Sequence, residues 1–217
     1  MHKNEASFSK NIYLTNSSTF DNIFNLNVFK IDYLEVENLN LDRYDALIFT
    51  SKNAIYSLDN LTSNWKNKDS YVIALKTANT VKQLGGNLKF VGQSGHGNEF
   101  ANELVKELKN KKALYIKAKK TVSSLLEILR ENSIDVDSVT TYETVCNKSS
   151  ISIQDNSIII FTSPSSVECF FKNYKWSSTY KAVVIGKTTA KYLPKDIEYY
   201  ISKETSVQEC IKLALKL

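Results

Sequence analysis

The sequence contains few of the residues on which most metal sites and catalytic triads depend. Its 217 residues include two histidines, His2 and His96, and three cysteines without a CxxC pair, Cys146, Cys169 and Cys210. This scarcity disfavours a metal site, a His-based triad and a disulfide framework. We expect the three cysteines to be small buried hydrophobes. Any catalysis should therefore depend on hydroxyls, lysines, carboxylates and backbone dipoles.

Long apolar runs and a strong charge of one sign are also missing. No stretch approaches the roughly 18 apolar residues of a membrane span, and Met1–Lys10 lacks the apolar centre of a signal peptide, so we expect a cytoplasmic protein. The net charge of +5 is spread along the chain, which disfavours a dedicated nucleic-acid binder and suits a small polyanionic ligand as well.

Short apolar runs alternate with polar breaks and helical patterns. Apolar residues three or four apart predict helices around Phe100–Leu108 and Leu125–Leu129. The alternation predicts βα units and parallel sheets. The expected strands are Ile12–Leu14, Ala46–Phe49, Val72–Leu75, Leu88–Val91, Ala113–Ile116, Ser157–Phe161, Lys181–Ile185 and Glu198–Ile201.

Two short motifs recur at one spacing. Phe49–Ala54 (F-T-S-K-N-A) returns as Phe161–Ser166 (F-T-S-P-S-S), and Lys76–Ala78 (K-T-A) returns as Thr188–Ala190 (T-T-A). Both pairs lie 112 residues apart (162 − 50 and 189 − 77). Two motifs in register indicate a duplicated α/β domain.

Because the first expected strand precedes the first copy of the motifs, one domain should be discontinuous. We predict one α/β domain from residues 1–33 with 146–217, and an inserted α/β domain from residues 38–141. The linkers are expected near 34–37 and 142–145, where short extended segments can pair as two antiparallel strands.

The loops after parallel strands are the expected binding elements. They lie at the carboxyl edge of a sheet, where the first N–H groups of the next helix are unpaired and attract anions. Each polar residue there also suits a helix N-cap, but the pairing across the duplication favours ligand binding for Ser51, Thr77, Ser163 and Thr189. The candidates are Ser51, Asn53, Thr77, Ser163, Ser165, Thr188 and Thr189.

A glycine-rich turn, Gly92–Asn98, separates a strand from an amphipathic helix. Its backbone amides, with Gly97 and Asn98 at the end, could approach a ligand closely. We expect Asn98 or Ser94 to cap the helix that follows. The turn matches neither GxxxxGK[ST] nor GxGxxG, so it gives little support for nucleotide binding.

Lysines and one tyrosine complete the candidate set. Lys117, like its neighbours Lys119 and Lys120, follows a strand and either faces an anionic ligand or belongs to a solvated loop. Lys187 occupies the loop that matches Lys76 in the first copy. Tyr142 lies in the second linker, where its side chain either packs or faces the cleft between two hinged domains.

In this order, the motifs resemble those of the uroporphyrinogen-III synthase family. The matches run in family order from about residue 45 to residue 192. Three departures stand out: Lys52 replaces a proline, Thr141 replaces a valine, and Asn16 stands where an N-terminal V-T-R-P element has arginine. The matching elements are Phe49–Ala54 (F-T-S-P-x-A), Thr77–Ala78 (T-A), Gly97–Asn98, Thr141–Thr144 (V-Y-x-T), Phe161–Ser165 (F-T-S-P-S) and Ile185–Ala190 (I-G-x-T-T-A).

The resemblance implies two flavodoxin-like parallel-sheet domains joined by a two-stranded linker, with substrate in the cleft and no cofactor. It implies a lyase of heme biosynthesis that cyclises hydroxymethylbilane to uroporphyrinogen III, losing water and inverting the terminal pyrrole ring. We expect a monomer without nucleic-acid or membrane partners. Our hypothesis for Tyr142 is that it hydrogen-bonds the leaving hydroxyl. The expected substrate-binding residues are Ser51, Asn53, Thr77, Gly97, Asn98, Lys117, Ser163, Ser165, Lys187, Thr188 and Thr189.

Two other functions fit parts of the pattern. A two-lobed binding protein would close on a small anionic ligand without turnover, and it would need a secretion signal, which the sequence does not display. A nucleotide-sugar transferase would need a stronger phosphate-binding motif than Gly92–Gly97. Neither accounts for the tyrosine in the linker.

Overall fold

The computed structural model describes residues 11–217 and divides into two compact units. Unit 1 contains the described residues up to Lys30 together with Val145–Leu217, and unit 2 is Ile31–Thr144. The expectations about Met1–Lys10 and His2 fall outside the described residues. Within residues 11–217, no helix has both the length and the apolar character needed to cross a membrane.

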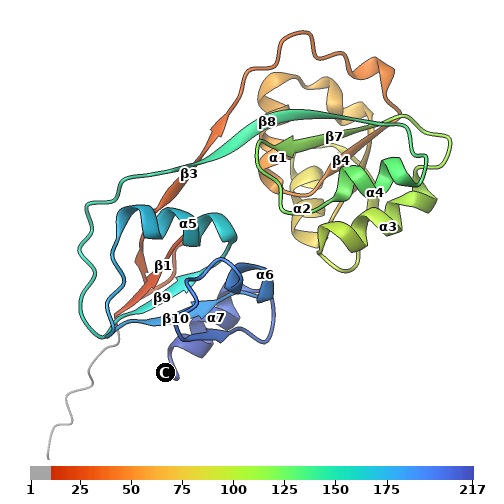
Figure 1. Cartoon of the computed structure of the whole chain (residues 1–217). Helices are drawn as coiled ribbons and strands as arrows, with labels where there is room; N and C mark the ends of the chain where they lie inside the picture. The colour runs from red at the N-terminus through yellow and green to blue at the C-terminus, as the bar shows by residue number, and fades with distance from the viewer. Residues whose placement is uncertain (1–10) are drawn as a thin grey trace, which may run out of the picture. The chain divides into compact units, whose positions relative to one another are not determined.

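Unit 2 is built on a six-stranded sheet with helices on both faces (Figure 1). On one face α1 (Lys52–Leu61) and α2 (Leu75–Gln83) pack on the sheet, and on the other α3 (Gly97–Glu107) and α4 (Leu125–Glu131). The connections also contain two short 3-10 turns, η1 (Leu41–Arg43) and η2 (Asn64–Asn67). The strands lie in the order β3 (Phe29–Tyr33), β8 (Val136–Cys146), β7 (Ala113–Ala118), β4 (Ala46–Phe49), β5 (Asp69–Val72) and β6 (Asn87–Val91).

Unit 1 is built on a five-stranded sheet whose paired strands are all parallel. One face is covered by α5 (Pro164–Asn173) and α6 (Lys187–Ala190), and the other by α7 (Val207–Ala214). The strands lie in the order β11 (Tyr199–Ile201), β10 (Lys181–Val184), β9 (Ile158–Phe161), β1 (Ile12–Leu14) and β2 (Phe24–Asn25).

The structure confirms the α/β fold class and the duplication. β4 and β9 begin 112 residues apart (158 − 46 = 112), and the same offset relates α1 to α5 and β5 to β10. The strand orders β6-β5-β4-β7-β8 and β11-β10-β9-β1-β2 are also equivalent, with β4 and β9 as matching central strands. The repeated motifs therefore occupy equivalent places in the two sheets.

One expected strand is misplaced by three residues. The apolar run Val72–Leu75 marks the end of β5, and α2 already begins at Leu75. Leu75 is 73% exposed, so it belongs to the solvent side of a helix start rather than to the buried sheet. Hydrophobicity located the apolar run but did not predict the turn between β5 and α2 that lies within it.

The prediction that all three cysteines are unpaired is wrong for two of them. Cys146, at the end of β8, and Cys169, in α5, form a disulfide with a Cα–Cα distance of 5.0 Å. The fold brings them together because the chain after β8 lies on α5, where Asn173 Nδ2 donates to the Asn147 carbonyl (3.0 Å). Cys210 is buried and free, as expected.

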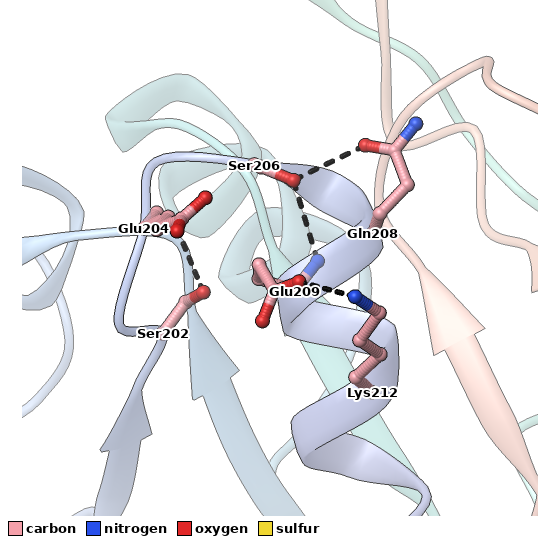
Figure 2. A network of polar contacts seen from close by, with 6 residues as sticks. All are labelled: Ser202, Glu204, Ser206, Gln208, Glu209 and Lys212. Carbon is pink, nitrogen blue, oxygen red and sulfur yellow. Dashed lines mark hydrogen bonds and ion pairs between the residues drawn. The ribbon is translucent and has the colours of Figure 1, made fainter.

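Figure 2 shows the loop that leads from β11 to the start of α7. The Ser202 hydroxyl donates to the Glu204 carbonyl (2.7 Å), which tightens the turn after β11. Ser206 is then the N-cap, and its hydroxyl accepts from the Glu209 N–H (3.3 Å). The loop packs beside Gly186, where a Cβ would lie 3.5 Å from Thr205 Cγ2.

We expect Ser206→Ala to destabilise unit 1 by about 1 kcal/mol, because it removes a side chain that satisfies a helix N-terminal N–H. Urea unfolding measures the change. Lys203→Ala, which changes an exposed residue of the preceding turn, serves as the control and should shift the free energy of unfolding by less than about 0.5 kcal/mol. Equal stability of the two variants would contradict the capping role.

Candidate functional site

In each unit, the strand order reverses beside the central strand. In unit 2 the chain runs outward from β4 through β5 to β6 and then returns to β7 on the other side; in unit 1 the corresponding pair is β9 and β1. Open α/β sheets bind ligands outside the carboxyl ends of the strands at such a reversal. The two F-T-S motifs follow β4 and β9 directly, so each stands at this position.

The first F-T-S loop is tied to both neighbouring elements. Ser51 is the N-cap of α1 and accepts from the Asn53 N–H (3.1 Å). The Thr50 hydroxyl lies 3.0 Å from the hydroxyl of Tyr115, a buried residue of β7. Burial raises the pKa of Tyr115, and the hydrogen bond with Thr50 acts in the opposite direction. Tyr115 was not among the expected site residues, since its sequence context is that of a buried strand.

Tyr142 lies next to this loop. It belongs to β8, is 6% exposed and packs in the core between the sheet and α1 and α2. Burial raises its pKa above the ordinary 10.0, and a side-chain hydrogen bond with Ser51 acts in the opposite direction. The Lys119 N–H donates to its carbonyl (2.9 Å). Tyr142 and Ser51 therefore come together at the carboxyl edge of unit 2.

The second F-T-S loop repeats this arrangement with different partners. Ser163 is the N-cap of α5 and forms a capping box with Ser166. The Thr162 hydroxyl accepts from Asn16 Nδ2 (3.3 Å) at the end of β1. Asn16 thus bonds to Thr162 as Tyr115 bonds to Thr50, although by strand register Leu14 corresponds to Tyr115. Asn16 too was missing from the expected set. Ser165 lies in the first turn of α5 and is partly exposed.

The T-A motifs differ from the F-T-S motifs in their capping. α2 begins after Ala74 and α6 after Gly186, and neither has a side-chain capping bond. Thr77 and Thr189 are buried in the first turns of these helices, while Lys187 and Thr188 are exposed. The N-cap explanation therefore holds for Ser51 and Ser163 but not for the T-A threonines.

The glycine turn lies farther from the strand reversal, because it follows the outer strand β6. The expected cap is wrong: His96 is the N-cap residue of α3, without a side-chain bond. Asn98 Oδ1 instead accepts from the Ser124 N–H (2.9 Å) at the start of α4. A Cβ on Gly97 would lie 2.5 Å from Ser123, so glycine permits this close approach of α3 and α4.

Lys117 is the next-to-last residue of β7, beside the strand reversal. It is partly buried, and its Nζ donates weakly to the Ala118 carbonyl (3.4 Å). A second lysine, Lys119, pairs with Glu143 of β8 (3.0 Å). The pair between Lys119 and Glu143 holds the loop between β7 and α4 close to the strand that carries Tyr142.

Comparisons with known proteins agree with the motifs. A family model described as uroporphyrinogen-III synthase HemD matches residues 28–212. The structure of uroporphyrinogen-III synthetase from Helicobacter pylori is 30% identical, with a TM-score of 0.84 over 95% of this chain and 99% of that one. A mutant uroporphyrinogen III synthase from Thermus thermophilus is 16% identical, with a TM-score of 0.59 over 95% and 99%, and shows the fold alone.

A curated relative, the porphyrin biosynthesis protein HemD of Ruminiclostridium josui, is 28% identical over 198 residues. The match covers 82% of this chain and 39% of that protein, so this chain spans about two fifths of the relative's length. Since the family model covers most of the described residues, the chain belongs to the uroporphyrinogen-III synthase family.

Proposed function

We propose that this chain cyclises hydroxymethylbilane to uroporphyrinogen III, with loss of one water and inversion of the terminal pyrrole ring. The observation that carries the proposal is the family match over residues 28–212. The meeting of Tyr142 and Ser51 at a strand reversal supports it further. The family match does not favour the two-lobed binding protein.

The substrate supplies its own electrophile in this reaction. Breaking the bond between the hydroxymethyl carbon and its oxygen releases hydroxide, which takes a proton and leaves as water. The resulting methylene-pyrroleninium is attacked by the substituted carbon of the last ring, and the spiro intermediate fragments and recloses inverted. No nucleophilic side chain is needed, because holding the linear tetrapyrrole in one reactive geometry can lower the barrier by roughly 7 kcal/mol or more.

Tyr142 is proposed as the catalytic residue that donates a hydrogen bond to the leaving hydroxyl. Because burial raises its pKa, the phenol stays protonated at neutral pH and keeps its donor. A hydrogen bond in such a water-poor place is stronger than one in solvent. The phenol can therefore assist departure of the oxygen without bringing a charge into the core.

The remaining expected residues are proposed to bind the substrate's eight carboxylates. Hydroxyl and amide donors at the two sheet edges recognise carboxylates, and lysines add charge-assisted hydrogen bonds. Because α2 and α6 have no side-chain capping bond, helix capping does not explain Thr77 and Thr189, which supports a role in binding. Our working proposal is a cytoplasmic monomer that acts on this small molecule without nucleic acid or cofactor. The set is Ser51, Asn53, Thr77, Gly97, Asn98, Lys117, Ser163, Ser165, Lys187, Thr188 and Thr189.

We expect Tyr142→Phe to lower the rate of type III formation about 10- to 100-fold, the effect of losing a hydrogen bond to a group that becomes charged. Hydroxymethylbilane also closes unaided to the type I isomer, so chromatographic separation of the two isomers is the measurement. The matched control is Tyr33→Phe in β3, the strand beside β8. Full type III activity of Tyr142→Phe would refute the role.

The raised pKa of Tyr142 gives a second prediction. Because burial makes the folded protein hold the proton more tightly than the unfolded chain, the stabilisation from the buried neutral phenol is present below pH 10 and is lost as pH rises through the folded-state pKa. Tyrosinate absorbance titrations of the native protein and of Tyr142→Phe, subtracted, isolate this group. Ionisation below pH 10 would contradict the buried, neutral donor.

Lys187 gives a third prediction, about substrate binding. Lys187→Gln should raise KM about three- to tenfold and change kcat less, because the exposed ammonium attracts the anionic substrate before and during reaction alike. The effect should shrink as salt is added. Lys191→Gln, an exposed lysine just after α6, is the control. A similar rise in KM for both variants would indicate general attraction rather than a site.

A further inference from the structure

A one-residue bulge interrupts β8 immediately before Tyr142. β7 and β8 pair in step from Ala113 opposite Val136 to Lys117 opposite Thr140, and then Ala118 stands opposite Tyr142. Thr141 is therefore an extra residue in β8. Such bulges are rare in parallel pairs and are known to re-aim side chains.

The bulge decides which face of the sheet Tyr142 occupies. In β8, Val136 packs on the α3 and α4 face, and Val139 packs on the α1 and α2 face, as alternation along a strand requires. Tyr142 is three residues after Val139 and would return to the α3 and α4 face in a regular strand. It packs instead in the core with α1, on the face where Ser51 starts that helix.

Two hydrogen bonds hold the extra residue in place. Thr141 is fully buried, and its hydroxyl lies 2.6 Å from that of Ser57 in α1. Either hydroxyl can donate in this pair, and we assign Thr141 as the donor because Ser57 has the Ala54 carbonyl as a second acceptor at 3.0 Å. The Thr141 carbonyl accepts from the Leu34 N–H (2.9 Å), just beyond β3.

We propose that Thr141, held by Ser57, is a positioning residue that maintains the bulge and thereby keeps Tyr142 beside Ser51. This inference rests on the proposed function, because Thr141 and Ser57 affect the reaction through Tyr142. The family motif that this segment resembles has valine where this chain has Thr141. A pair of apolar side chains at positions 57 and 141 should therefore maintain the bulge as the two hydroxyls do.

The donor direction makes the two single substitutions unequal. Thr141→Val removes a donor, but Ser57 keeps its bond to Ala54, so no buried polar group loses its last partner. Ser57→Ala leaves the Thr141 hydroxyl buried without an acceptor, which is the more costly change. When both hydroxyls are replaced, nothing polar remains unpaired.

The test is a cycle of Ser57→Ala, Thr141→Val and the double variant, with kcat, KM and the type III fraction measured for each. We expect kcat to fall about three- to tenfold in Ser57→Ala and about two- to threefold in Thr141→Val, with KM less affected. The double variant should recover to within about twofold of the native enzyme, and Thr141→Ser should keep native activity. Thr80→Val, which removes a buried hydroxyl within α2, is the matched control.

Repeating Ser57→Ala in a Tyr142→Phe background separates this inference from the proposed function. If the pair acts through Tyr142, Ser57→Ala causes no further loss of kcat there. An equal loss in both backgrounds, additive effects in the double variant, or native activity in both single variants would each overturn the positioning role. Full activity of Tyr142→Phe alone would instead overturn the proposed role of Tyr142. Urea unfolding confirms that each variant is folded.

Discussion

The burial of the two central strands on both faces is the constraint that fixes where chemistry can occur. All four residues of β4 and of β9 are at most 3% exposed, so neither strand offers a polar group along its length. Polar atoms can appear only where such a strand ends, because burying them earlier would leave them without partners. Thr50 and Thr162 are the first polar residues at these ends. Their position beside a strand reversal brings two neighbouring strands within reach of one loop.

The duplicated units share a framework but differ in what surrounds it. Ser51 and Ser163 cap equivalent helices, whereas the threonines before them bond to a tyrosine in one unit and to an asparagine in the other. The shared caps are structural requirements of a helix start, so they survive duplication for reasons of stability. The partners of the threonines carry no such requirement. Differences between the units should therefore concentrate at these partners.

The fold was predictable from the sequence because its signals are local. A four-residue apolar run that ends in the phenylalanine of F-T-S marks a strand and a helix start, and the constant offset of 112 residues marks the duplication. The disulfide and the Thr50–Tyr115 contact depend instead on which elements become neighbours. The bulge at Thr141 depends on the register of two strands, which no composition or periodicity encodes. Tyr142 was found through its motif, but the reason it faces Ser51 needed the structure.

Under the proposed function, a buried tyrosine suits a substrate that is heavily acidic. A buried lysine beside Ser51 would attract carboxylates more strongly, but it would lose its hydration on folding. It would also bind the first substrate carboxylate that approached. A neutral phenol costs little to bury once its oxygen has a partner, and it prefers the group that gains negative charge in the reaction. Charges remain useful where water screens them, as at exposed Lys187. Under the proposed function, attraction of the substrate lies at the surface and selectivity lies in the core, so the orientation of Tyr142, set by the extra residue Thr141 in β8, decides where the proposed donor is placed.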